Sequence, residues 1–210
     1  FRRAVGRRGP RQKLIGQLRK ALGGAHGLIL DFRGLALGDV SSIASLLDGL
    51  MPLRRQLLLF LTLAARDLGR PWRGMFGDDY WALAQKVDGL ILRFDDELKA
   101  PSRPGPIIDD GRLREVLARV LEAVPAWKVI LRLPAYGWQW TGRPLKRLGL
   151  WPALAWENPE PVPYHQALSL AQEHGWGDGG GRVDYGQENP RRVWIETVKT
   201  MAAKASLVNK

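Results

Sequence analysis

Apolar residues recur along this chain in two alternating patterns, one helical and the other made of short continuous runs. From Arg11 onward they fall at helical spacing until Gly23-Gly24 ends the pattern, which predicts a first helix. The run from Gly27 to Phe32 is short and continuous, as in a buried strand. The same alternation predicts further helices over 39–51, 78–87 and 112–124, and further strands over 57–63, 89–94 and 128–133.

Continuous apolar strands that alternate with helices indicate an α/β fold whose parallel sheet is covered on its faces. An open doubly wound sheet and a closed eight-fold barrel both agree with this order. The pattern supplies four strands. Residues 134–190 are rich in Gly, Pro and Trp with one helical patch over 164–173, and the pattern over 191–207 predicts mostly helix.

The composition is that of a globular protein, with 210 residues of which 45% are hydrophobic, enough for one sizeable core. The most apolar stretch, 56–65, is too short to cross a bilayer, so no transmembrane segment is expected. No signal peptide is visible. Because the chain begins with Phe1, this absence says nothing about the compartment.

Cysteine is absent, which excludes disulfides, thiolate catalysis and cysteine zinc sites. The three histidines, His26, His165 and His174, do not have the spacing of metal ligands. We therefore expect neither a metal site nor a cofactor.

The net charge of +11 and the nine tryptophans favour a polymer ligand, because cations attract polyanions and Trp stacks on bases and sugar rings. The basic residues are dispersed, and the densest group lies at the N-terminus. That group is a candidate contact for an anionic polymer or an acidic protein partner. No nucleic-acid-binding motif accompanies it, so nucleic acid is the disfavoured partner. The N-terminal group contains Arg2, Arg3, Arg7, Arg8 and Arg11.

Six segments in order carry a family resemblance. They are 26–35, 77–88, 91–97, 104–107, 124–138 and 193–196 with Lys204. The first aligns without a gap with the strand pattern Asp-Gly-x-Asp-x-Asp-x-Glu. Together they resemble the family-18 glycoside hydrolases, and most closely the spore-germination and cell-wall branch.

This resemblance implies strands four to seven of a (β/α)8 barrel, with a small α+β insertion after the seventh strand. The corresponding division is 1–137 for the barrel portion, 138–190 for the inserted subdomain and 191–210 for a return helix. The other four barrel strands are not found in this sequence. The resemblance also implies an exported or envelope-associated protein.

The family's chemistry is substrate-assisted: the acetamido oxygen of the sugar attacks the anomeric carbon while a Glu protonates the leaving oxygen. Alignment puts Arg33 at that Glu, Asp31 at the Asp that orients the acetamido group, and Phe94 at a Tyr that hydrogen-bonds it. Ile29 replaces another inward carboxylate, while Asp95 keeps the family identity. A guanidinium has a pKa above about 12 and cannot act as a general acid. We therefore expect no intact catalytic set, and an ion pair of Arg33 with Asp31 or Asp95.

Three aromatic residues follow the seventh strand at alternate positions, Tyr136, Trp138 and Trp140. They are candidates for stacking on pyranose rings, together with Asp31 and Asp95 as substrate-binding residues. The alternative is that they pack the inserted subdomain.

Three functions remain open from the sequence. The first is an inactive barrel that binds a glycan containing N-acetylglucosamine, peptidoglycan or chitin-like, or acts as an envelope scaffold. The second is an active retaining hydrolase of β-1,4-linked N-acetylglucosamine polymers. The third is a structural subunit of a larger assembly that uses its basic surface.

Overall fold

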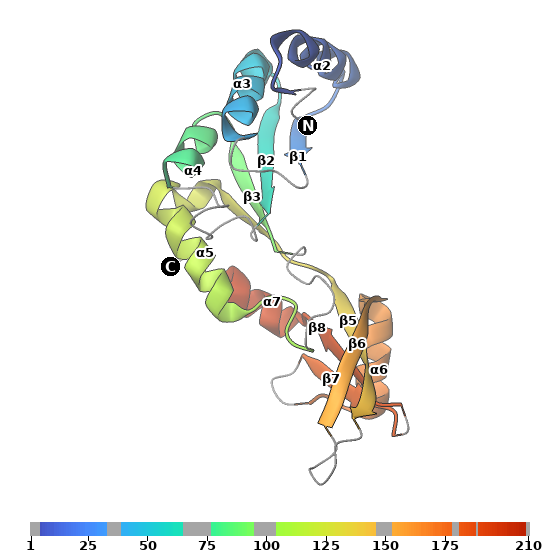
Figure 1. The fold of residues 1–210 in the computed structure, drawn as a ribbon. Helices are drawn as coiled ribbons and strands as arrows, with labels where there is room; N and C mark the ends of the chain where they lie inside the picture. Colours follow the sequence, from blue (N-terminus) through green and yellow to red (C-terminus); the bar gives the residue numbers. More distant parts are fainter. Residues whose placement is uncertain are drawn as a thin grey trace. The chain divides into compact units, whose positions relative to one another are not determined.

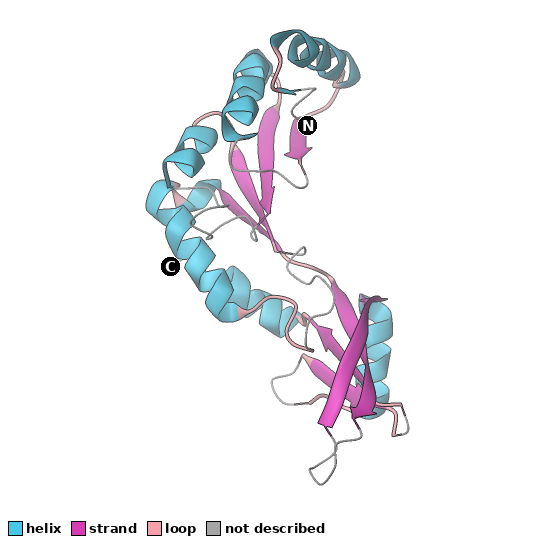
Figure 2. Ribbon diagram, in the orientation of Figure 1, coloured by secondary structure: helices cyan, strands magenta, loops and turns pink. Residues whose placement is uncertain are grey.

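The computed structural model describes residues 5–32, 39–64, 77–94, 104–145, 153–177, 181–187 and 189–208. Most of its helices and strands are labelled in Figure 1, and Figure 2 colours them by type. The chain divides into two compact units, Phe1–Arg93 with Arg114–Arg132, and Phe94–Leu113 with Leu133–Lys210. Within the residues that the structure covers, no helix has both the length and the apolar character needed to span a membrane.

The first unit is built on a parallel sheet in which four strands are neighbours in chain order, as the sequence predicts. The strands are β1 (Gly27–Asp31), β2 (Leu58–Ala64), β3 (Gly89–Arg93) and β4 (Val129–Arg132). Helix α2 (Arg8–Ala21) precedes them, and the connections hold α3 (Val40–Leu50), η2 (Met51–Arg55), α4 (Gly77–Ala84), α5 (Asp110–Ala123) and η4 (Ala126–Lys128). Parallel neighbours need such crossover connections, because a tight turn joins only antiparallel strands.

Alternate strand residues on one face of this sheet form the core of the first unit. Leu30, Leu61 and Leu92 are buried on this face. Buried residues of α3, α4 and α5 complete the core, among them Ile43, Leu46, Leu47, Leu83, Val116 and Val120. Figure 1 shows α3 and α4 along one side of the strands.

The other face of the sheet is only partly covered. Ile29, Leu58 and Ile130 lie on it by the register of the strands, and they are 60%, 54% and 43% exposed. Parallel sheets are normally covered on both faces, and a closed barrel buries this one in its interior.

A polar cluster joins the amino ends of the strands. The Asp88 carboxylate accepts hydrogen bonds from the Leu59 backbone N–H at 2.8 Å and from Arg54 Nη2 at 2.5 Å. Lys128 Nζ donates to the carbonyls of Ala84 and Val87 at 2.6 and 3.0 Å. Burial alone would raise the pKa of Asp88, but these hydrogen bonds and the charges of Arg54 and Lys128 outweigh it and lower that pKa. Burial lowers the pKa of Lys128, and the charge of Arg54 adds to that effect.

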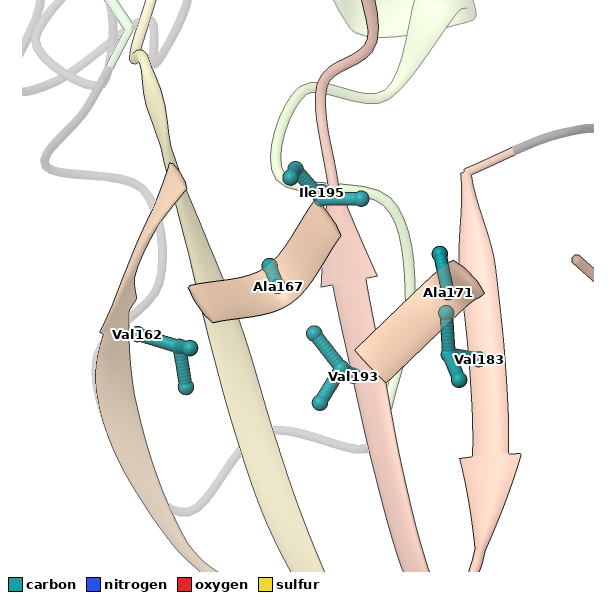
Figure 3. Close-up of a cluster of buried hydrophobic side chains, with 6 residues drawn as sticks. All are labelled: Val162, Ala167, Ala171, Val183, Val193 and Ile195. Carbon is teal, nitrogen blue, oxygen red and sulfur yellow. The ribbon is translucent and has the colours of Figure 1, made fainter. Parts of the chain in front are cut away.

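The second unit is an antiparallel sheet with the strand order β6-β5-β8-β7. Its strands are β5 (Tyr136–Leu145), β6 (Ala153–Pro163), β7 (Arg182–Tyr185) and β8 (Arg191–Ile195), and helix α6 (Tyr164–His174) follows β6. Ala167 and Ala171 of α6 belong to a buried cluster with side chains from three of the strands (Figure 3). The strand members of that cluster are Val162, Val183, Val193 and Ile195.

The C-terminal segment departs from the prediction of mostly helix over 191–207. Residues 191–195 form β8, and helix α7 (Val198–Ala205) begins only after it. Val193 and Ile195 are buried while Arg192 and Trp194 are less so, which is the alternation of a strand. Thr197 caps α7 in a reciprocal arrangement with Thr200, so the helix starts there.

Candidate functional site

The carboxyl ends of the parallel strands bring one acidic and two basic side chains together. Asp31 ends β1, Arg93 ends β3 and Arg132 ends β4. Arg93 Nη1 lies 2.8 Å from Asp31 Oδ1, and Arg132 Nη1 lies 3.3 Å from Asp31 Oδ2. In barrels of this type the carboxyl ends of the strands form the catalytic face.

Both carboxylate oxygens of Asp31 are therefore engaged by guanidinium groups. The Arg93 side chain is fully buried, whereas Asp31 and Arg132 are partly exposed. A buried guanidinium needs a partner for its charge, so Asp31 stabilises Arg93 in the fold. An Asp held this way has no free oxygen to orient a substrate amide unless one ion pair opens.

The sequence-predicted catalytic positions are only partly placed by the structure. Ile29 lies on the same face as Asp31 and is exposed. Phe94 follows β3 and is fully buried. Arg33 and Asp95 lie outside the described residues, so the ion pair expected for Arg33 stays a prediction.

Sequence reasoning missed Arg93 and Arg132 as partners of Asp31. A signal was present, because each residue ends an apolar strand run. The register opposes Arg93 to Arg132 and puts both on the face of Asp31. The sequence does not give this register, so it could not predict that the three side chains meet.

The three aromatic residues that follow the parallel strands belong to a strand, β5, in which they occupy alternate positions. The rings of Tyr136 and Trp138 meet edge to face, with centroids 6.0 Å apart and an interplanar angle of 72°. Both are half-buried, whereas Trp140 is fully buried. A fully buried ring offers no face to a sugar, so its burial favours the packing alternative for Trp140.

Residues of β6, β7 and β8 lie with Trp138 on the face of the sheet opposite α6. The sequence did not predict a binding role for any of them. Trp194 is directly opposite Trp138 across the β5–β8 pair. Arg192 lies over the Trp156 ring at 4.7 Å and forms an ion pair with Asp184. The face opposite α6 is therefore aromatic and charged.

A pocket of about 340 Å³ adjoins Trp194 within the second unit. Asp109, Asp110 and Thr200 contribute polar atoms to its lining. The indole N–H groups of Trp138 and Trp194 are shielded from solvent and have no acceptor among the described residues. Buried indole donors ordinarily have a partner, so an acceptor from a ligand or an ordered water would satisfy them.

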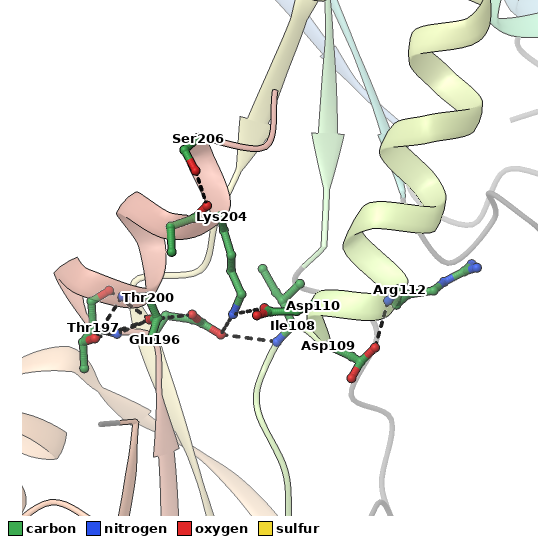
Figure 4. A network of polar contacts seen from close by, with 10 residues as sticks. Ile108, Asp109, Asp110, Arg112, Glu196, Thr197, Thr200, Lys204 and Ser206 are labelled. Carbon is green, nitrogen blue, oxygen red and sulfur yellow. Dashed lines mark hydrogen bonds and ion pairs between the residues drawn. The ribbon is translucent and has the colours of Figure 1, made fainter. Parts of the chain in front are cut away.

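A buried ion pair forms one wall of this pocket (Figure 4). Lys204 Nζ lies 2.6 Å from Glu196 Oε1 and 3.6 Å from Asp110 Oδ1. Glu196 Oε2 accepts a hydrogen bond from Thr200 Oγ1 at 2.8 Å, and Oε1 accepts one from the Ile108 N–H at 3.4 Å. Glu196 therefore contacts both α7 and the segment before α5, and its role is structural.

Within the described ranges, no group of three or more His, Asp or Glu side chains is arranged to hold a metal ion.

Comparison with known proteins gives one curated relative and several solved structures. No protein-family model matches the chain. YdhD of Bacillus subtilis, named as a sporulation-specific glycosylase, is 25% identical over 145 residues, which are 66% of this chain and 32% of YdhD. The chain therefore spans about a third of the length of that relative.

The solved structures match nearly the whole chain. The YdhD structure has a TM-score of 0.76 at 19% identity and covers 98% of this chain, which spans 70% of it. The spore cortex-lytic enzyme SleL of Bacillus cereus has a TM-score of 0.75 at 21% identity over 98% of this chain and 48% of SleL. A GH18 chitinase of Cycas revoluta, solved with (GlcNAc)4, has a TM-score of 0.76 at 16% identity over 99% of this chain and 67% of the chitinase.

These likenesses confirm the predicted fold and the resemblance to the family-18, chitinase-like and spore-germination group. The four parallel strands are a portion of a (β/α)8 barrel, and the barrel is chosen over the open doubly wound sheet.

Proposed function

We propose that this chain is a catalytically inactive, family-18-like barrel portion that binds a glycan containing N-acetylglucosamine. The proposed ligands are peptidoglycan and chitin-like polymers, and the proposed location is the cell envelope. Relatives with this fold include a spore cortex-lytic enzyme and a chitinase solved with a tetramer of N-acetylglucosamine. The observation that carries the proposal is the state of Asp31, whose two oxygens both pair with arginines.

Inactivity is supported by the residue types at the aligned positions. Arg33 stands where the family has its proton donor, and Phe94 lacks the hydroxyl of the aligned Tyr. Loss of general acid catalysis alone costs roughly 10²–10⁴-fold in rate. The engagement of Asp31 removes the remaining group that would orient the acetamido oxygen.

Glycan binding is supported by the β5–β8 sheet face. Trp194 is half-buried and lines the pocket together with Asp109 and Asp110. Trp138 is the residue that pairs with Trp194, and its half-buried ring contacts the Tyr136 ring. Aromatic rings beside a few polar groups are the usual composition of sugar sites. Trp140 is left out of the proposed site because it is fully buried.

The first test is hydrolysis of a chromogenic chitobiose glycoside by the purified chain. We expect no release of chromophore above the rate of a protein-free blank, because the residue aligned with the proton donor is Arg33, which keeps its proton at neutral pH. A rate above the blank that is abolished by Asp31→Asn would favour the active hydrolase instead.

The second test is retention on insoluble peptidoglycan and on chitin. We expect Trp138→Ala to bind about tenfold more weakly than the parent, since one stacking ring is worth about 1.4 kcal/mol. The matched control is Trp81→Ala, which removes an exposed tryptophan of α4 in the other unit and is expected to bind as the parent does. If Tyr136→Ala and Trp138→Ala are both retained like the parent, the β5–β8 face is not the glycan site.

A further inference from the structure

The positive charge of this chain is concentrated at its start. The first 30 residues hold six arginines and two lysines, and no acidic residue precedes Asp31. The rest of the chain holds 24 of the 32 basic residues against all 21 acidic ones, so it is nearly balanced. Most of the net charge of +11 therefore comes from this segment.

Helix α2 presents this charge on one side. At about 100° per residue, positions 8, 13, 19 and 20 fall within an arc of about 140°, with Arg8 and Arg19 at the edge next to Ile15. All four cationic side chains are exposed, and none has an ion-pair partner among the described residues. They are Arg8, Lys13, Arg19 and Lys20.

The four charges are not neutralised within the helix. Arg8 is the first residue of α2, where the helix dipole disfavours a cation, whereas Arg19 and Lys20 lie in the last turn, where it favours them. No acidic side chain three or four residues away offsets any of the four charges. Positive charge that the helix does not neutralise is available for a partner.

The apolar side of α2 is already used. Ile15 is buried, and its Cδ1 occupies the space that a Cβ at Gly49 of α3 would take. Asp48, the acidic neighbour of Gly49, is paired with Lys86. Because α2 is fixed by its apolar side, it is not free to insert into a bilayer as an amphipathic anchor. The exposed side of α2 can therefore bind a partner through its positive charges.

We propose that this face of α2 binds a linear polymer with phosphodiester groups at regular intervals, of the poly(glycerol phosphate) type. The four cations span positions 8 to 20, or about 18 Å of helix, which is long enough for several phosphate groups. Guanidinium groups bind phosphate in a bidentate manner. The choice of an envelope polymer as the ligand rests on the proposed function. The charge pattern of α2 is an observation that does not depend on it.

Nucleic acid carries the same phosphodiester chemistry but is the less suitable occupant. Proteins that bind single strands combine cations with aromatic rings on which the bases stack, and α2 contains no aromatic residue. Its sequence also belongs to no helix-turn-helix or other duplex-reading motif.

The test compares three proteins for binding to fluorescently labelled poly(glycerol phosphate) over a series of salt concentrations. One is the parent. The second carries four α2 substitutions: Arg8→Gln, Lys13→Gln, Arg19→Gln and Lys20→Gln. The third removes the same charge at exposed positions elsewhere: Arg55→Gln, Arg114→Gln, Arg191→Gln and Lys199→Gln.

We expect the α2 variant to bind roughly a hundredfold more weakly and to lose about three in the slope of log K against log salt, since each phosphate contact contributes about 0.7. The control variant should stay within about twofold of the parent. Circular dichroism should show the same helix content for all three proteins. The α2 variant should still be retained on chitin, which separates failure here from failure of the glycan proposal.

Three outcomes would overturn the proposal. One is equal weakening of both variants, which would indicate a general effect of net charge. Another is parent binding that does not depend on salt. The third is tighter parent binding to a DNA oligonucleotide than to poly(glycerol phosphate), which would assign the face to nucleic acid.

Discussion

Lys204→Ala lowers the free energy of unfolding by about 4 kcal/mol, the largest effect that we expect from a single charged residue in this chain. The substitution leaves the Glu196 carboxylate buried, with hydrogen bonds from Thr200 and Ile108 but without its cation. Removal of one partner of a buried pair is costly because the remaining charge has lost its hydration and gains nothing in return. Urea unfolding followed by tryptophan fluorescence measures the change.

A matched pair of variants separates the charge from the packing. Lys204→Met keeps most of the volume and should destabilise almost as much as Lys204→Ala. The double variant Glu196→Gln with Lys204→Met leaves no buried charge, so it should be more stable than Lys204→Met alone. A loss below about 1 kcal/mol in Lys204→Ala would show that the pair does not hold α7 in place.

Trp140→Ala destabilises the second unit by about 4 kcal/mol, because a large buried ring is replaced by a cavity. The side chain is fully buried on β5, in contrast to Tyr136 and Trp138 of the same strand. Thermal unfolding followed by circular dichroism measures the loss.

The conservative change Trp140→Phe tests the role of this ring in binding. It keeps an aromatic core residue and should retain glycan binding at close to the parent affinity, at a cost of about 1–2 kcal/mol in stability. If Trp140→Ala were as stable as the parent but no longer bound glycan, Trp140 would be a residue of the glycan site and not of the core.

The barrel portion was largely predictable because its local signals agree with its tertiary role. Strands buried between layers must be apolar throughout, and helices that cover them must have an apolar stripe. Residues 89–92 are apolar and largely buried, and α5 has an apolar stripe, whereas 27–30 are apolar although Ile29 is exposed. The prediction of helix for 191–195 was wrong, because five residues are too few to distinguish a strand from the start of a helix by periodicity.

The candidate site was less predictable, because its residues come from separate parts of the chain. Asp31 was found from a motif within one strand, whereas its partners Arg93 and Arg132 are 62 and 101 residues away. Trp194 reaches Trp138 only through the β5–β8 pairing. Each such contact depends on a strand register, which no single segment encodes.

The sequence by itself determined the α/β alternation and the helical and strand periods of the apolar residues, and it predicts, through the family resemblance, that Arg33 occupies the position of a proton donor. These follow from residue type and local spacing, which are properties of the chain before it folds. Only the tertiary structure decided that Asp31 pairs with two arginines, that Trp140 is fully buried while Trp138 is half-buried, and that Glu196 and Lys204 form a buried pair. Burial and ion pairing are decided by which surfaces meet, and distant segments meet only when the sheets assemble.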